Sequence, residues 1–201
     1  MLEKRWYPVL YMFVITAAFS SVIIGFSFST QHRVEANAKI VLEKAILEVL
    51  PDQYQAGMTK QQIHQRFIER IGEPDEQSGG AYVLKENGTI KAYAVPIEGR
   101  GFWAQIKGIV GVAEDKKTIT GIAFYEQSET PGLGAEIAKP DFREQFAKKV
   151  MAEGDEPINF KRPGEQLGES EVHAVTGATQ TSTRLERIIN ENLNQWREKI
   201  K

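Results

Sequence analysis

The first 33 residues show an unusual distribution of apolar and charged positions. No Lys, Arg, Asp or Glu occurs between Arg5 and Arg33, and residues 6–29 read WYPVLYMFVITAAFSSVIIGFSFS. At about 1.5 Å of rise per residue, a helix of this length covers the roughly 30 Å hydrocarbon core of a bilayer. We therefore predict a transmembrane helix over 6–29. Lys4 and Arg5 indicate that residues 1–5 form a cytoplasmic stub, which places the rest of the chain outside the cytoplasm.

Two other interpretations of this segment are weaker. A cleaved signal peptide has an apolar region of about 7–15 residues, which is shorter than this one. The sequence Ala36-Asn37-Ala38 resembles a cleavage site, but it lies beyond the charged Arg33 and Glu35. A buried helix of a soluble protein rarely has so long an uncharged run. An uncleaved anchor explains the segment best, and it predicts a protein of the inner (cytoplasmic) membrane.

Three later stretches have helical periodicity. Residues 30–58 contain an amphipathic connecting helix that ends before Pro51, and a second helix is predicted over 59–71 with Thr59 as its N-cap. A final helix is predicted over 183–199. Its first residues, Thr183 to Glu186, have the S/T-x-x-E form of a capping box.

The middle of the chain alternates in the way that strands do. Residues 81–97, AYVLKENGTIKAYAVPI, contain an Asn-Gly turn between two alternating runs, which is a strong hairpin pattern. Residues 103–127 show a second hairpin pattern, with two alternating runs on either side of a turn at 114–117. A short helix is predicted from Pro140 and one more strand over 156–162. The fold class is therefore α+β, an antiparallel sheet packed with helices, in an extracytoplasmic domain over 59–201.

Composition excludes several kinds of chemistry. The chain has no cysteine, which excludes disulfides, thiol catalysis and cysteine metal sites. Its three histidines lack ligand spacing, so we predict no metal site and no catalytic residue. A formal net charge of −2 gives no electrostatic reason to expect nucleic acid. Any chemistry is therefore expected to come from a bound cofactor.

Two loops are candidates for holding a ligand. The first, SETPGLGAE over 128–136, follows a predicted strand, and its glycines permit a tight turn or close approach of a ligand. The second, VTGATQTST over 175–183, is rich in hydroxyl groups and lies just before a predicted helix N-terminus, where unpaired N–H groups attract anions. From the residues alone, an ordinary helix cap and a phosphate-binding loop both remain open.

Three motifs in order resemble the FMN-carrying subunits of two related membrane complexes. TGAT at 176–179, followed by QTS, resembles a flavinylation motif, and ETPGLG at 129–134 and GRGFWAQIKG at 99–108 resemble further signatures of the same family. One complex is the Rnf ferredoxin:NAD+ oxidoreductase, and the other is the Na+-translocating NADH:quinone reductase (Nqr). The resemblance spans nearly the whole chain, including the anchor.

The resemblance implies a covalent cofactor. In that family the last threonine of the motif carries FMN through a phosphoester bond, and a Mg2+-dependent flavin transferase installs it from FAD. That threonine is Thr179 here. Thr176, Gly177 and Ala178 are expected to shape the loop, and Thr181 and Ser182 to donate hydrogen bonds to the phosphate.

Other residues are implied around the flavin ring. Glu129 and Thr130 are expected near the ring edge and Leu133 against its face, while Lys161 is expected to hold the charge of the reduced flavin. Trp103 suits either the pocket or the core. The family has aspartate where this chain has His173, which is either a neutral replacement or a contact to the phosphate or the ring.

These observations predict an electron-transfer subunit that works with other membrane subunits of an ion-translocating redox complex and has no independent catalytic site. Two alternatives stay open. One is a flavinylated relay in another extracytoplasmic electron-transfer chain. The other is a non-redox structural subunit that has lost its flavin, an interpretation that only His173 favours.

Overall fold

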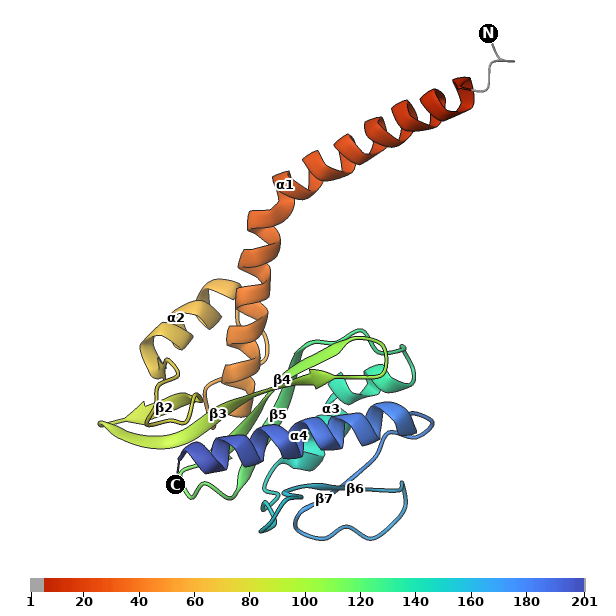
Figure 1. The fold of residues 1–201 in the computed structure, drawn as a ribbon. Helices are drawn as coiled ribbons and strands as arrows, with labels where there is room; N and C mark the ends of the chain where they lie inside the picture. The colour runs from red at the N-terminus through yellow and green to blue at the C-terminus, as the bar shows by residue number, and fades with distance from the viewer. Residues whose placement is uncertain (1–5, 201) are drawn as a thin grey trace. The chain divides into compact units, whose positions relative to one another are not determined.

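The computed structural model describes residues 6–200, which divide into two compact units on either side of residue 40 (Figure 1). The predicted cytoplasmic stub lies outside the described residues. Helix α1 (Tyr7–Val49) contains an 18-residue window of mean hydropathy 2.2, none of it buried. This helix is long and apolar enough to cross a membrane. The predicted apolar helix is thus present, as one element with no break after residue 29.

The last turns of α1 belong to the core of the second unit. Ile46, Leu47 and Val49 are buried, and the compact unit begins at Ile40 rather than at residue 59. The predicted connecting helix of 30–58 is therefore not a separate element. The apolar spacing was identified correctly, but it marks a core helix because these side chains pack against the sheet.

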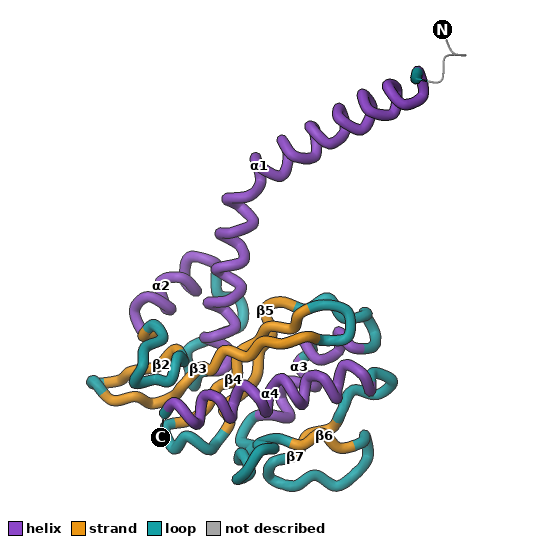
Figure 2. Tube along the Cα trace, in the orientation of Figure 1, coloured by secondary structure: helices purple, strands orange, loops and turns teal. Residues whose placement is uncertain are grey.

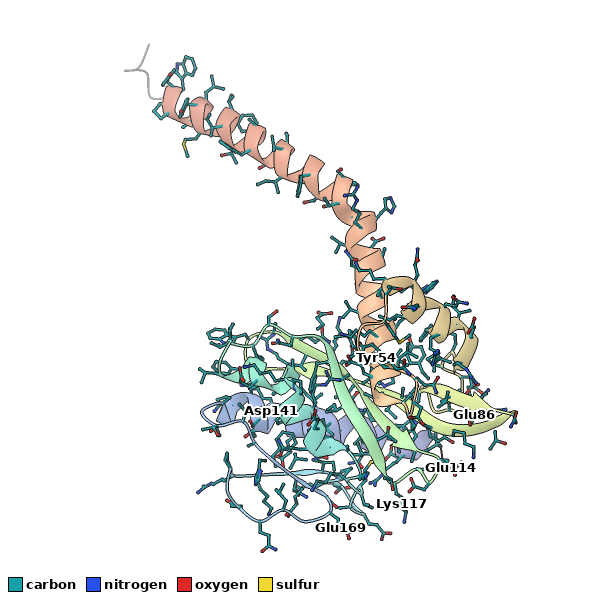
Figure 3. The ribbon with its side chains drawn as sticks, turned by 180° about the vertical axis from the view of Figure 1, so that it is seen from behind. Tyr54, Glu86, Glu114, Lys117, Asp141 and Glu169 are labelled. Atoms are coloured by element: carbon teal, nitrogen blue, oxygen red, sulfur yellow. The ribbon has the colours of Figure 1, made fainter. Side chains whose placement is uncertain are left out.

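A five-stranded antiparallel sheet forms the centre of the second unit (Figure 2). Its strands follow the order of the sequence: β1 (Ile71–Gly72), β2 (Tyr82–Glu86), β3 (Thr89–Arg100), β4 (Gln105–Ala113) and β5 (Ile119–Glu126). Both predicted hairpins are confirmed. Asn87 and Gly88 turn the first with φ of 50° and 79°, as an Asn-Gly turn requires. Glu86 marks the end of this hairpin, and Glu114 and Lys117 mark the end of the next (Figure 3).

Alternation along the strands gives the sheet two buried faces. On β3, Tyr93, Val95 and Ile97 pack in one core cluster, while Ala92 and Ala94 pack in the other. The first cluster is covered by α4 (Thr179–Lys199), which crosses the sheet in Figure 1, and the second by the end of α1 and by α2 (Lys60–Arg70). This arrangement confirms the predicted α+β class.

Short elements fill the remainder of the unit. Thr59 is the N-cap of α2, as predicted, and the structure adds a complete capping box with Gln62. After β5 come the 3-10 helix η1 (Gly134–Ala138), helix α3 (Pro140–Arg143) and the 3-10 helix η2 (Glu144–Phe146). Strands β6 (Asn159–Lys161) and β7 (Glu171–His173) form a separate parallel pair. The strand predicted over 156–162 is thus present, with a parallel partner that sequence reasoning did not anticipate.

We expect Asn190→Ala to destabilise the domain by about 2–4 kcal/mol. Asn190 is buried in α4, and its amide donates to the carbonyl of Ile158 at 2.8 Å and accepts from the N–H of Ile158 at 2.9 Å. Alanine would leave both buried backbone groups unpaired. Urea unfolding measures the loss, and Asn194→Ala is the control because its single bond to Asp155 is more exposed. Equal losses in the two variants would contradict the prediction.

Candidate functional site

Helix α4 begins one turn earlier than the sequence indicated. Thr179 is its first residue and Ala178 its N-cap, which supplies no side-chain hydrogen bond. The predicted capping box at Thr183 is therefore wrong. The Glu186 side chain instead accepts the N–H of Phe160 on β6 at 2.7 Å. The pattern S/T-x-x-E was present, but the helix already includes Thr181, whose hydroxyl donates to Glu129 on the ETPGLG loop.

Glu186→Gln should make the stability of the domain less sensitive to pH. Burial raises the pKa of Glu186, and the nearby charge of Glu156 adds to this, whereas the Phe160 bond opposes it. The native state therefore binds a proton at higher pH than the unfolded state does, so stability present at low pH is lost as pH rises through the raised pKa. Glutamine keeps the acceptor and removes the charge. Unfolding temperatures from about pH 4 to 7 should fall less in Glu186→Gln than in wild type.

The control for this experiment is Glu191→Gln, on the exposed face of the same helix. A pH profile for Glu186→Gln that parallels the wild-type profile would contradict the assignment. The same parallel profile is the result expected of the control.

The TGAT loop presents an exposed hydroxyl at a helix N-terminus. Thr176, Gly177 and Thr179 are exposed, and Gly177 has φ of 75°, a conformation that favours glycine. The first intrahelical bond runs from the Ser182 N–H to the Ala178 carbonyl. Within the described residues, no hydrogen bond uses the N–H groups of Thr179, Gln180 and Thr181 or the Thr179 hydroxyl. Free N–H groups and the helix dipole favour an anion here.

The next two hydroxyls point into the protein. Thr181 and Ser182 are 4% and 3% exposed. The Thr181 hydroxyl donates to Glu129 at 2.6 Å, and the Ser182 hydroxyl accepts the N–H of Val175 at 3.1 Å. Their predicted bonds to a phosphate would compete with these contacts. Within this cluster, Thr179 is the hydroxyl that is exposed at the start of the helix.

The ETPGLG loop lies beside the start of α4. Leu133 is 44% exposed, and a Cβ added to Gly177 would lie 3.3 Å from its Cδ2, so the leucine packs over the TGAT glycine. Thr130 is exposed and accepts the indole N–H of Trp103 at 3.0 Å. Glu129 is only 5% exposed, and its carboxylate is directed inward. Leu133 and Thr130 are thus available to a ligand, whereas Glu129 lies beneath them.

An exposed aromatic turn completes this surface. Phe102 and Trp103, 42% and 62% exposed, pack edge to face with ring centres 4.9 Å apart. The Arg184 guanidinium lies 5.8 Å from the Phe102 ring centre and donates to the carbonyl of Gly101. Trp103 is therefore not a core residue. Sequence reasoning missed Phe102 and Arg184; Phe102 lies within the GRGFWAQIKG motif, and a helix started at Thr179 would have placed Arg184 in its second turn.

A groove of about 370 Å³ is bordered by Thr176 of the TGAT loop. Its walls are the ETPGLG turn, the α3 region and the residues that lead into TGAT. They include Gly132, Lys139, Asp141, Gln145 and Thr176, and Figure 3 shows Asp141 on α3. The TGAT loop therefore borders this groove through Thr176 and lies against the ETPGLG loop through Gly177.

Lys161 and His173 lie opposite each other on β6 and β7. Lys161 forms an ion pair with Glu171 at 3.2 Å. The His173 ring nitrogen Nε2 is 2.9 Å from the Glu165 carbonyl oxygen, and its backbone N–H donates to Gln145. Both predicted roles remain predictions, since each side chain contacts a neighbour within this small sheet.

The candidate site therefore consists of residues from three distant segments. It brings together Trp103, Thr130, Leu133, Gly177 and Thr179, with Glu129 and Thr181 beneath the surface. The unpaired helix N–H groups suit a phosphate, and the aromatic and leucine side chains suit an apolar ring. These residues fit FMN.

Comparison with known proteins agrees with this geometry. Residues 101–194 match the sequence model of the FMN-binding domain. The chain is 39% identical over 108 residues to the NqrC protein of the Na(+)-translocating NADH-quinone reductase of Vibrio vulnificus, covering 52% of this chain and 42% of that protein. For the corresponding protein of Chlamydia pneumoniae the identity is 47% over 77 residues, covering 38% and 24%. The alignments thus span less than half of these curated relatives.

Two solved structures have the same fold. NqrC from Parabacteroides distasonis superposes with a TM-score of 0.69 at 24% identity, covering 86% of this chain and 96% of that one. The Shewanella oneidensis NqrC structure gives 0.65 at 19% identity, covering 80% and 99%. Residues 101–194, in which the three motifs meet at one site, therefore match the FMN-binding domain, and the chain has the fold of the two solved NqrC structures.

Proposed function

We propose that the chain is an electron-transfer subunit of a membrane-bound, ion-translocating redox complex and carries FMN as a phosphoester on Thr179. The observation that carries this proposal is the position of Thr179. Its hydroxyl is exposed at the first residue of α4, two residues after Gly177, over which Leu133 packs, and beside three N–H groups that no described residue accepts. An esterified phosphate retains negative charge, so this helix N-terminus would stabilise it.

The chain's own residues supply attachment and position. The α4 N-terminus would hold the phosphate, Leu133 and Trp103 offer apolar surface to the ring, and Thr130 presents a hydroxyl beside them. FMN, when bound, supplies reversible uptake and release of electrons. Lys161 adds a positive charge on β6, where it would favour added electrons if its side chain left Glu171.

Attachment requires a donor and an enzyme. The Thr179 oxygen would attack the flavin-side phosphorus of FAD, form a new O–P bond, lose its proton and release AMP as the pyrophosphate bond breaks. Among the described residues no cluster of three or more His, Cys, Asp or Glu residues could hold a metal ion. A separate flavin transferase that brings its own Mg2+ is therefore the proposed partner for maturation.

The apolar helix supports a place among other membrane subunits. Its membrane window is entirely unburied within this chain, so other subunits and lipid are its natural neighbours. With Lys4 and Arg5 at the cytoplasmic face, the domain would lie on the extracytoplasmic side. A relay in another extracytoplasmic electron-transfer chain would use the same site.

Purification in mild detergent from cells with an active flavin transferase tests this function. We expect the peptide containing Thr179 to carry the mass of one FMN less water, and the flavin absorbance to bleach on reduction and return on oxidation. Subunits that co-purify would separate an Rnf or Nqr complex from another chain. A Thr179 peptide that is entirely unmodified would overturn the proposal and favour a structural subunit.

A further inference from the structure

One buried carboxylate touches all three sequence motifs. Glu129, the first residue of ETPGLG, accepts the backbone N–H groups of Phe102 and Trp103 at its Oε1, at 2.9 and 3.2 Å. Its Oε2 accepts the Thr181 hydroxyl at 2.6 Å. All three partners donate, which matches the acceptor-only character of a carboxylate. The aromatic turn, the loop and the first turn of α4 are thereby joined at one side chain.

Two glycines leave room for this carboxylate. A Cβ on Gly101 would lie 2.6 Å from Glu129 Oε1, and a Cβ on Gly134 would lie 2.8 Å from Oε2 and 2.5 Å from the Thr181 hydroxyl oxygen. Such distances are shorter than any normal contact. The second glycine of GRG and the last glycine of ETPGLG therefore have the same physical explanation, which is close packing around Glu129.

The contacts also link the two outer parts of the site. Thr181 lies two residues after Thr179 in α4, so a bond to Thr181 fixes the turn that presents the attachment hydroxyl. In the aromatic turn, the indole N–H of Trp103 donates to the hydroxyl of Thr130, the residue after Glu129. Among the described residues no salt bridge involves Glu129, and the positive end of the α4 dipole is the favourable field around it.

We propose that Glu129 is a positioning residue that holds the Phe102–Trp103 aromatic turn in a fixed place relative to Thr179. This inference rests on the proposed function and replaces the expectation that Glu129 contacts the flavin ring. Its role is geometric, because the bonds require an acceptor of one particular length. Glutamine can accept the two N–H groups at Oε1 and donate from Nε2 to the Thr181 oxygen, whereas aspartate is one methylene too short.

The first test is amide hydrogen exchange in the full chain, in detergent, on a Thr179→Ala background that needs no flavin. Glu129→Ala should speed exchange at Phe102 and Trp103 about tenfold or more, the effect of losing a hydrogen bond to a charged group. Glu129→Gln should stay near wild type, and Glu129→Asp should behave like alanine. Thr181→Val removes the hydroxyl that donates to Glu129 Oε2, so it should speed exchange at the same two amides.

Exchange at buried β3 and β4 amides shows that each variant is folded, and Thr181→Val decides the question should Glu129→Ala unfold. Unchanged Phe102 and Trp103 exchange in both Glu129→Ala and Thr181→Val would overturn the proposal. The proposal would also be overturned if Glu129→Asp protected these amides and Glu129→Gln did not. The charge of the side chain would then matter, and its length would not.

The second test uses the flavinylated chain with Thr179 intact. The visible circular dichroism of the bound flavin should keep its wild-type shape in Glu129→Gln and change in Glu129→Asp and Glu129→Ala. An unchanged spectrum in Glu129→Ala would overturn the proposal even with faster amide exchange. If Thr179 carries no flavin, the proposed function fails while the exchange experiment still decides the role of Glu129.

Discussion

Thr179→Ala should abolish covalent flavin while leaving the domain folded. The proposed phosphoester uses the Thr179 oxygen, so the expected loss is complete rather than partial. The fold should tolerate the change because the Thr179 side chain is exposed and, within the described residues, has no hydrogen-bond partner. Alanine is also the best helix former, and the helix has no side-chain cap to lose. In-gel fluorescence and intact mass report the flavin, and thermal unfolding reports the fold.

Thr183→Ala is the matched control, because it removes an exposed hydroxyl one turn later in α4, outside the TGAT motif. This variant should retain covalent FMN, and Thr179→Ser should retain at least part of it because a hydroxyl remains at the same place. Flavin that persists in Thr179→Ala, attached to Thr176 or Thr183 instead, would refute the assignment.

Sequence patterns correctly predicted the elements that are stabilised by residues close together in the sequence. The Asn87-Gly88 turn and the alternation around it specify a hairpin by themselves, and both survive in β2 and β3. The same holds for the Thr59 cap and for the apolar helix. In each case neighbours in sequence supply the hydrogen bonds, or the apolar run itself is the observation.

Features that depend on contacts between residues far apart in the sequence were predicted less accurately. The Thr183–Glu186 capping pattern failed because the start of α4 is fixed by Thr181 bonding to Glu129, 52 residues away along the chain. The inward direction of Glu129 has the same origin. Neither composition nor hydrophobic periodicity predicts this direction. In the sequence, Gly101 and Gly134 have the pattern of ordinary turn residues, and only the structure shows that both lie against the Glu129 carboxylate. The motif resemblance pointed to Glu129 and Thr181, but it implied contacts to the flavin for both and not the bond between them.

A chain that begins at Ile40 should be soluble without detergent, in contrast to the full chain. The membrane window exposes apolar side chains such as Val9, Phe13 and Val22, at 71%, 70% and 70%, and none of the window is buried. At about 25 cal/mol per Å² of apolar surface, exposing it to water is prohibitive. Fractionation of cells that express each form measures the difference. A membrane-bound Ile40 form would show that the domain itself binds the membrane.

The same shortened chain also tests where the folded unit begins. The core needs Ile46, Leu47 and Val49, which fill the face of the sheet opposite α4. A chain starting at residue 59, the boundary that sequence pattern suggested, would lose them. Each buried aliphatic side chain is worth about 2–5 kcal/mol, so the three together approach or exceed the whole stability of a domain. We therefore expect cooperative thermal unfolding from the Ile40 form and none from the form that starts at 59. Equal unfolding curves for the two forms would mean that the end of α1 does not contribute to the stability of the domain.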